Sequence, residues 1–173
     1  MNIKKLITFV LFVNINFTFV YSLEPDIFVQ STVNRASEVL SKNISKEEKI
    51  NELKSIAKET VDIRGVGFYS LGSTRKKLDD NEIEKYLDLF ESYFLKSFSS
   101  RLAEYTDPKI RVDSQKKLNE KYTMVSSTLL ATEDKPEINI DWRVVTKDPD
   151  NPLIIDVIIE GVSLAKVQKE EFN

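Results

Sequence analysis

Cysteine and histidine are both absent from this chain of 173 residues. Without cysteine the protein forms no disulfide in any compartment. Without either residue it can build neither a Ser-His-Asp or Cys-His catalytic group nor the usual zinc site of histidine and cysteine ligands. Carboxylate-pair and lysine chemistry remain open, but the composition argues against an enzyme and against a bound metal.

The chain also lacks an excess of positive charge. Its 25 lysines and arginines stand against 28 acidic side chains, for a formal net charge of −3. Nucleic-acid phosphates require a basic footprint, so we expect no nucleic-acid partner. No cofactor-binding motif stands out either: Gly65-Val66-Gly67 lacks the rest of a phosphate-binding loop, and we expect no cofactor.

A single apolar run stands at the N-terminus. Lys4 and Lys5 precede a largely apolar segment, residues 6–20, and Ser22 offers a small residue for cleavage. This layout is typical of a secretory signal peptide. An uncleaved anchor is the alternative, although a span needs about 20 apolar residues and this run is shorter and interrupted. We expect residues 1–22 to be a cleaved signal peptide and residues 23–173 to form a single domain.

Helical periodicity dominates the first half of the remaining chain. It predicts helices beginning at Pro25, after Ser45, over residues 63–71 and over residues 80–105. Two capping boxes mark the starts of the second and fourth helices, and Gly72 is a natural end for the third. The residues that form them are Ser45 with Glu48, and Asp79 with Glu82. The longest helix carries an apolar stripe made of Ile83, Leu87, Phe90, Phe94, Phe98 and Leu102.

The second half changes to a period of two residues, which predicts strands. Four strands are expected, over residues 109–115, 121–132, 137–147 and 153–160, followed by a short helix that ends near Phe172. Short polar turns between them indicate an antiparallel meander. Helices first and a meander afterwards predict an α+β fold, in which N-terminal helices cover one face of a twisted four-stranded sheet.

Alternation within the last two strands predicts which side chains face inward. Ile138, Ile140, Trp142 and Val144 share one face of the third strand, and Leu153, Ile155, Val157 and Ile159 share one face of the fourth. The second strand is comparably apolar on both faces, so its inner face stays open. Periodicity alone favours ordinary core contacts for these residues. Arg143, Asp141 and Asp156 fall on the outward faces, where we expect exposed ion pairs of structural importance only.

Several local signatures occur in a fixed order along the chain. They are Leu71-Gly72, the block from Tyr86 to Phe94, Arg101-Leu102-Ala103-Glu104-Tyr105, Asp141-Trp142-Arg143, and the block from Asp156 to Leu164 with Glu171-Phe172. Together they resemble the MlaC family, also called the toluene-tolerance auxiliary component family. The resemblance extends from about Pro25 to Phe172.

The resemblance implies a periplasmic phospholipid carrier. Such carriers move lipid between an inner-membrane ABC transporter with an MCE-domain subunit and an outer-membrane lipoprotein complex, and so maintain outer-membrane lipid asymmetry. They hold acyl chains in a pocket between a twisted sheet and helices. The lipid-binding residues that this implies here are Val66, Leu71, Leu87, Phe90, Phe94, Phe98, Ile140, Trp142, Ile155, Val157, Ile159 and Leu164.

Two departures from the family pattern leave alternatives open. Where relatives often carry an aromatic residue, this chain has Arg75-Lys76-Lys77, which suits either a lipid phosphate, an anionic partner or a solvated loop. Relatives also continue beyond the position of Phe172 with another helical segment, so we expect a pocket open on one side or a truncated product. The alternatives to a carrier are an adaptor that binds the transporter without cargo and, more remotely, a carboxylate enzyme.

Overall fold

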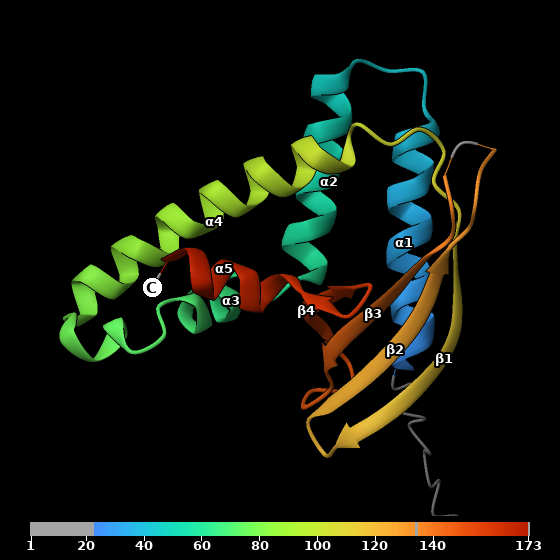
Figure 1. Cartoon of the computed structure of the whole chain (residues 1–173). Helices are drawn as coiled ribbons and strands as arrows, with labels where there is room; N and C mark the ends of the chain where they lie inside the picture. The colour runs from blue at the N-terminus through green and yellow to red at the C-terminus, as the bar shows by residue number, and fades with distance from the viewer. Residues whose placement is uncertain (1–22, 134, 173) are drawn as a thin grey trace, which may run out of the picture.

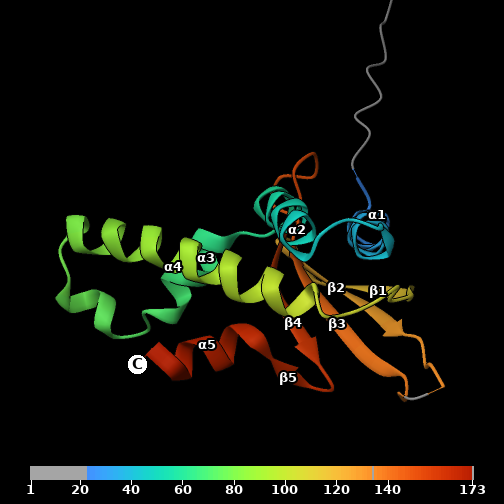
Figure 2. The same ribbon diagram turned by 90° about the horizontal axis from the view of Figure 1, so that it is seen from above.

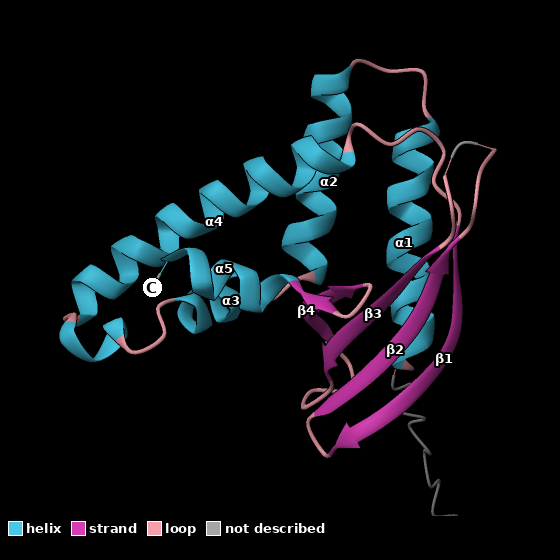
Figure 3. Cartoon of the chain, viewed as in Figure 1, coloured by secondary structure: helices cyan, strands magenta, loops and turns pink. Residues whose placement is uncertain are grey.

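The computed structural model describes residues 23–133 and 135–172, so the expected signal peptide, residues 1–22, lies outside the described residues. The helices are α1 (Pro25–Ser41), α2 (Lys46–Thr60), α3 (Ile63–Ser70), the 3-10 helix η1 (Thr74–Lys77), α4 (Asp80–Leu102) and α5 (Leu164–Phe172). The strands are β1 (Ile110–Asn119), β2 (Tyr122–Leu129), β3 (Ile138–Val145), β4 (Leu153–Ile159) and β5 (Val162–Ser163). Helices precede the sheet, which confirms the α+β fold (Figure 3).

Local side-chain chemistry explains where the helices begin and end. Ser45 accepts a hydrogen bond from the Glu48 backbone N–H while the Glu48 carboxylate accepts one from the Ser45 N–H, and Asp79 and Glu82 do the same at α4. These contacts satisfy N–H groups that a helix start leaves unpaired. Gly72 follows α3 with φ of 52°, a left-handed conformation that favours glycine and ends a helix.

The sheet has five strands rather than the four expected. All pair antiparallel in the order β1-β2-β3-β4-β5. Glu160 and Gly161 reverse the chain with φ of 48° and 80°. Val162 and Ser163 can therefore pair with Ile159 and Ile158 before α5 begins. Two residues are too few to show alternation, so the sequence pattern gave no sign of β5.

The predicted inner face of β4 is wrong at the start of the strand, because β4 contains a bulge. Val157 pairs with Trp142 and Ile159 with Ile140, but beyond the bulge Val144 pairs with Ile154. Ile154 is only 2 % exposed, whereas Leu153 is half-buried. The extra residue shifts the alternation by one position, so Ile154 rather than Leu153 joins the inner face.

The edge strand β1 extends well beyond the helices. From residue 113 to residue 119 all its side chains are exposed. Its pairing with β2 is interrupted by two irregularities, one between Val112 and Ser114 and one between Lys117 and Asn119. This half of β1 therefore contributes little to the core.

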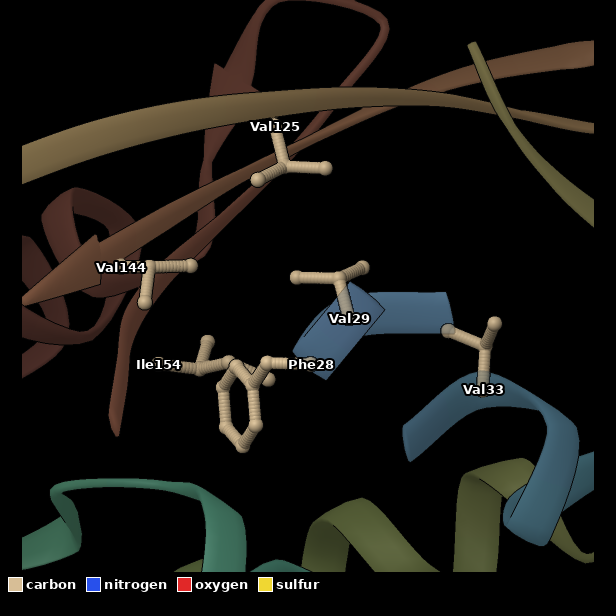
Figure 4. Packing of buried hydrophobic residues seen from close by; sticks show 6 residues of the cluster. All are labelled: Phe28, Val29, Val33, Val125, Val144 and Ile154. Carbon is tan, nitrogen blue, oxygen red and sulfur yellow. The ribbon is translucent and has the colours of Figure 1, made fainter. Parts of the chain in front are cut away.

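Helix α1 covers one face of the sheet and makes the first of three separate apolar clusters. This cluster joins Phe28, Val29 and Val33 of α1 to Val125, Val144 and Ile154 of the sheet (Figure 4). Helix α4 instead packs against α2 and α3 and points away from the sheet, while α5 lies beside α3 (Figures 1 and 2). Within the described residues, no helix has the length and apolar character needed to cross a bilayer.

Two further clusters fill the helical part of the molecule. The second contains Ala57, Ile63, Val66, Phe90, Leu95 and Ala165. The third contains Val39, Leu40, Leu53 and Ile56. The half-buried Val61 packs against both the first and the second cluster, so these two meet at their edges.

Candidate functional site

An apolar cavity of about 230 Å³ lies between the three clusters. Members of all three line it: Val33 and Ile154 from the first, Ala57, Val66 and Ala165 from the second, and Leu40, Leu53 and Ile56 from the third. Side chains of the three clusters therefore surround a space that they do not fill. An apolar cavity of 150 Å³ already stays dry and binds benzene, so this space suits hydrocarbon rather than water.

Every layer of the fold contributes to the cavity wall. Helices α1, α2 and α4 supply Ala36, Thr60, Phe94, Phe98 and Leu102; the sheet supplies Leu129, Ile138, Ile140, Trp142, Ile155, Val157 and Ile159; and α5 supplies Leu164, Ala165 and Gln168. Among the described residues that line it, none is a lysine or an arginine. The wall can therefore hold acyl chains but offers no cation to a phosphate.

Polar atoms in the wall are bound mostly by the protein itself. The Trp142 indole N–H donates to Ser127 Oγ at 2.8 Å, which leaves the ring as an apolar surface. The hydroxyls of Thr32 and Thr60 donate to backbone carbonyls one turn earlier in their own helices. Gln168 differs, because its Oε1 is buried and has no hydrogen-bond partner among the described residues while its Nε2 donates to Glu171.

The exposed members of the wall mark where the cavity meets solvent. Tyr105 is 40 % exposed and Ile159 is 37 % exposed, whereas the other lining side chains are buried or half-buried. The Lys135 ammonium lies 5.2 Å from the centre of the Tyr105 ring. Among the described residues of the wall, Tyr105 and Ile159 are therefore the most accessible to solvent.

Nine of the twelve predicted lipid-binding residues line this cavity. They are Val66, Phe94, Phe98, Ile140, Trp142, Ile155, Val157, Ile159 and Leu164. Leu71, Leu87 and Phe90 do not line it, and all three are buried elsewhere. Leu87 and Phe90 lie against Gly67 of α3, so their half of the α4 stripe is used for helix packing. A lipid-binding role for these three residues stays a prediction, which their position outside the cavity wall does not support.

The contribution of the first two helices to the cavity was not predicted from the sequence. Thr32, Val33, Ala36 and Leu40 of α1 line the cavity, together with Leu53, Ile56 and Ala57 of α2. Their helical spacing was visible, but it predicts a buried face and does not say whether that face meets side chains or an open space.

Asp156 is buried, whereas its strand position predicted an exposed ion pair. Its side chain is only 2 % exposed, although Arg143 does lie 3.5 Å away as expected. The carboxylate accepts hydrogen bonds from Ser163 and from the start of α5. Asp141 accepts a hydrogen bond from Ser126 instead. The cover comes from β5 and α5, which return over this part of β4.

The basic run Arg75-Lys76-Lys77 lies in η1 and does not line the cavity. All three side chains are exposed, and the Arg75 guanidinium stands 5.1 Å from the centre of the Phe68 ring. This arrangement places the run on the outer surface of the helical part.

Helices and a sheet thus surround a largely apolar cavity of a kind suited to an apolar ligand. The chain belongs to the MlaC family, because the model of that family, described as MlaC protein, matches residues 30–173. No curated protein matches the chain in sequence.

The fold is similar to that of a phospholipid-binding protein from Ralstonia solanacearum, whose structure was solved in complex with a phospholipid. The TM-score is 0.71 and the sequence identity 15%, over 85% of this chain and 84% of that one. At this identity the likeness establishes the shared fold.

Proposed function

We propose that this protein is a periplasmic phospholipid carrier that holds acyl chains in the central cavity. It is exported by a signal peptide, residues 1–22, and residues 23–173 act as one lipid-carrying domain. It takes lipid from one membrane system and delivers it to another, between an inner-membrane ABC transporter with an MCE-domain subunit and an outer-membrane lipoprotein complex. This transport maintains outer-membrane lipid asymmetry.

The observation that carries the proposal is the unfilled apolar centre between the three clusters. Tight packing is the rule in protein interiors, and leaving such a space costs stability, so a space lined from every layer of the fold indicates a cargo. Family membership and the phospholipid-bound structural neighbour support phospholipid as that cargo.

The energetics suit transport rather than chemistry. Each buried methylene is worth about 0.8 kcal/mol, so two chains of about 16 carbons gain roughly 25 kcal/mol over water. Transfer from a bilayer to an apolar pocket is close to neutral, because both environments are hydrocarbon. Release into water is therefore negligible, and delivery requires a partner that deforms the pocket.

Mass spectrometry of residues 23–173, purified from cells with an outer membrane, tests the proposal. We expect co-purified phospholipid, and uptake of labelled phospholipid from liposomes after the protein has been delipidated. A protein that carries no lipid and takes up none is not a carrier, and an adaptor for the transporter would then be the better explanation.

A further inference from the structure

Helix α5 is a wall of the cavity that is attached at both of its ends. Leu164, Ala165 and Gln168 line the cavity from this helix. At its C-terminal end the Phe172 ring lies 5.6 Å from Tyr93 and 6.0 Å from Phe90, measured between ring centres. Its position against α3 and β4 therefore decides whether the cavity is closed on this side.

The other end of α5 is held by Asp156, which comes from the neighbouring strand. Its Oδ1 accepts a hydrogen bond from the Ala165 N–H at 3.0 Å, and its Oδ2 accepts one from the Ser163 hydroxyl at 2.7 Å. Ser163 Oγ in turn accepts from the Lys166 N–H at 3.1 Å. Two N–H groups that the helix start leaves unpaired are thus bound, and a carboxylate at a helix N-terminus is favoured.

The connection between β4 and α5 consists of a tight turn and a two-residue strand. Gly161 has φ of 80°, and a Cβ atom placed on it would touch nothing within 4 Å. Gly161 itself thus faces open space, whereas Glu160 beside it is hydrogen-bonded to Asn139 of β3, so the turn is fixed to the sheet and α5 begins beyond it. The buried carboxylate opposes a tilt of α5 away from β4, because the tilt would break its hydrogen bonds to Ala165 and Ser163 and leave it only the ion pair with Arg143 at 3.5 Å.

We propose that Asp156 is a positioning residue for ligand exchange: it holds α5 closed against the cavity and so sets the rate at which an apolar ligand enters and leaves. The inference rests on the proposed function for its biological meaning, but its test does not require phospholipid. Asp156 also lies among the residues that line the cavity, so Ser163→Ala, which loosens α5 without changing the cavity wall, separates its action through the helix from direct contact with the ligand.

The test measures release of the apolar dye N-phenyl-1-naphthylamine by stopped-flow fluorescence, together with amide hydrogen exchange of α5 and of β2. In Asp156→Ala we expect release to accelerate about tenfold or more, since two hydrogen bonds to a charged group are lost. Exchange should rise in α5 and stay unchanged in β2. Asp156→Asn, which can still bond both Ala165 and Ser163, should remain within about threefold of the unaltered protein.

Ser163→Ala is a milder variant in case Asp156→Ala does not fold, and we expect an intermediate release rate from it. The inference is overturned if a variant shows faster amide hydrogen exchange in α5 but releases the dye at an unchanged rate. So would exchange that rises equally in β2, because the effect would then be global unfolding. A dye that enters while phospholipid does not would reject the carrier function and leave the role of Asp156 intact.

Discussion

Gly67 of α3 and Phe90 of α4 approach so closely that a Cβ atom on Gly67 would stand 2.7 Å from Phe90 Cδ1. The Leu87 Cδ2 atom would be 3.1 Å away. This contact joins the short helix to the long one, and it accounts for a glycine inside a helix, where alanine is ordinarily preferred by about 1 kcal/mol.

We expect Gly67→Ala to destabilise the protein by about 1–2 kcal/mol, because overpacking of the buried Phe90 outweighs the gain in helix propensity. Urea unfolding measures the change. The double variant Gly67→Ala with Phe90→Leu should recover part of the loss. A more stable Gly67→Ala protein would show that the two helices separate without cost.

Val157→Lys should abolish lipid loading, since the ammonium would enter a largely apolar cavity. Among the described lining residues the charged one is Asp156, and its carboxylate is already bound by Ser163, Ala165 and Arg143. Lipid co-purification and liposome uptake measure this. Leu118→Lys is the matched control, because Leu118 is exposed on the outer half of β1 and should accept the charge. Normal loading in Val157→Lys would remove this side chain from the site.

Phe90 and Phe98 lie on the same helix and should respond differently to the same change. Phe90→Leu is expected to cost roughly 1–2 kcal/mol of stability, since its ring is packed among Tyr86, Phe94 and Phe172, and to change lipid affinity less than Phe98→Leu does. Phe98→Leu should cost less stability and change lipid affinity, because Phe98 lines the cavity. Thermal unfolding and liposome competition separate the two, and equal behaviour would contradict the division of the α4 stripe.

Asp113 should make stability depend on pH. The Thr128 hydroxyl and then the Arg111 guanidinium hold the pKa of this carboxyl below its usual value. Because the folded state favours the charged form, the contribution is fully present above the ordinary carboxyl pKa and is lost as the pH falls through the lowered pKa. Asp113→Asn should therefore lose less stability than the unaltered protein when its thermal midpoint is followed from pH 7 to pH 3.

Thr128→Val provides the control for this pH effect, since it removes the main donor while keeping the shape of the side chain. Like Asp113→Asn, it should lose less stability than the unaltered protein when the pH falls. If the unaltered protein and both variants lose the same stability between pH 7 and pH 3, other groups cause the pH dependence.

The starts of the helices could be predicted because they depend on residues close together in the sequence, whereas α4 ends at Leu102 and not at the expected residue 105. Ser45 with Glu48 and Asp79 with Glu82 form their capping boxes as the sequence indicated. The position of Ile155 at the β4 bulge could not be predicted, because alternation holds only while the pairing stays regular.

The residues of the site were predictable only where local periodicity decides which side chains are buried. Periodicity identified the apolar face of α4, but a straight helix of 23 residues passes from one neighbour to another. Its first part meets Gly67 of α3, and its second part, with Phe94 and Phe98, meets the cavity. What an apolar face meets is decided by tertiary structure, which also explains why α1 and α2 were not recognised as cavity walls.

The two edge strands of the sheet, β1 and β5, affect how readily molecules of this protein associate with one another. An unpaired strand invites a second chain to extend the sheet, which is how many proteins aggregate. Here one border is interrupted twice and carries Lys116 and Lys117, and the other has only two residues. Neither offers a long regular template, so molecules of this protein can crowd together without polymerising through their backbones.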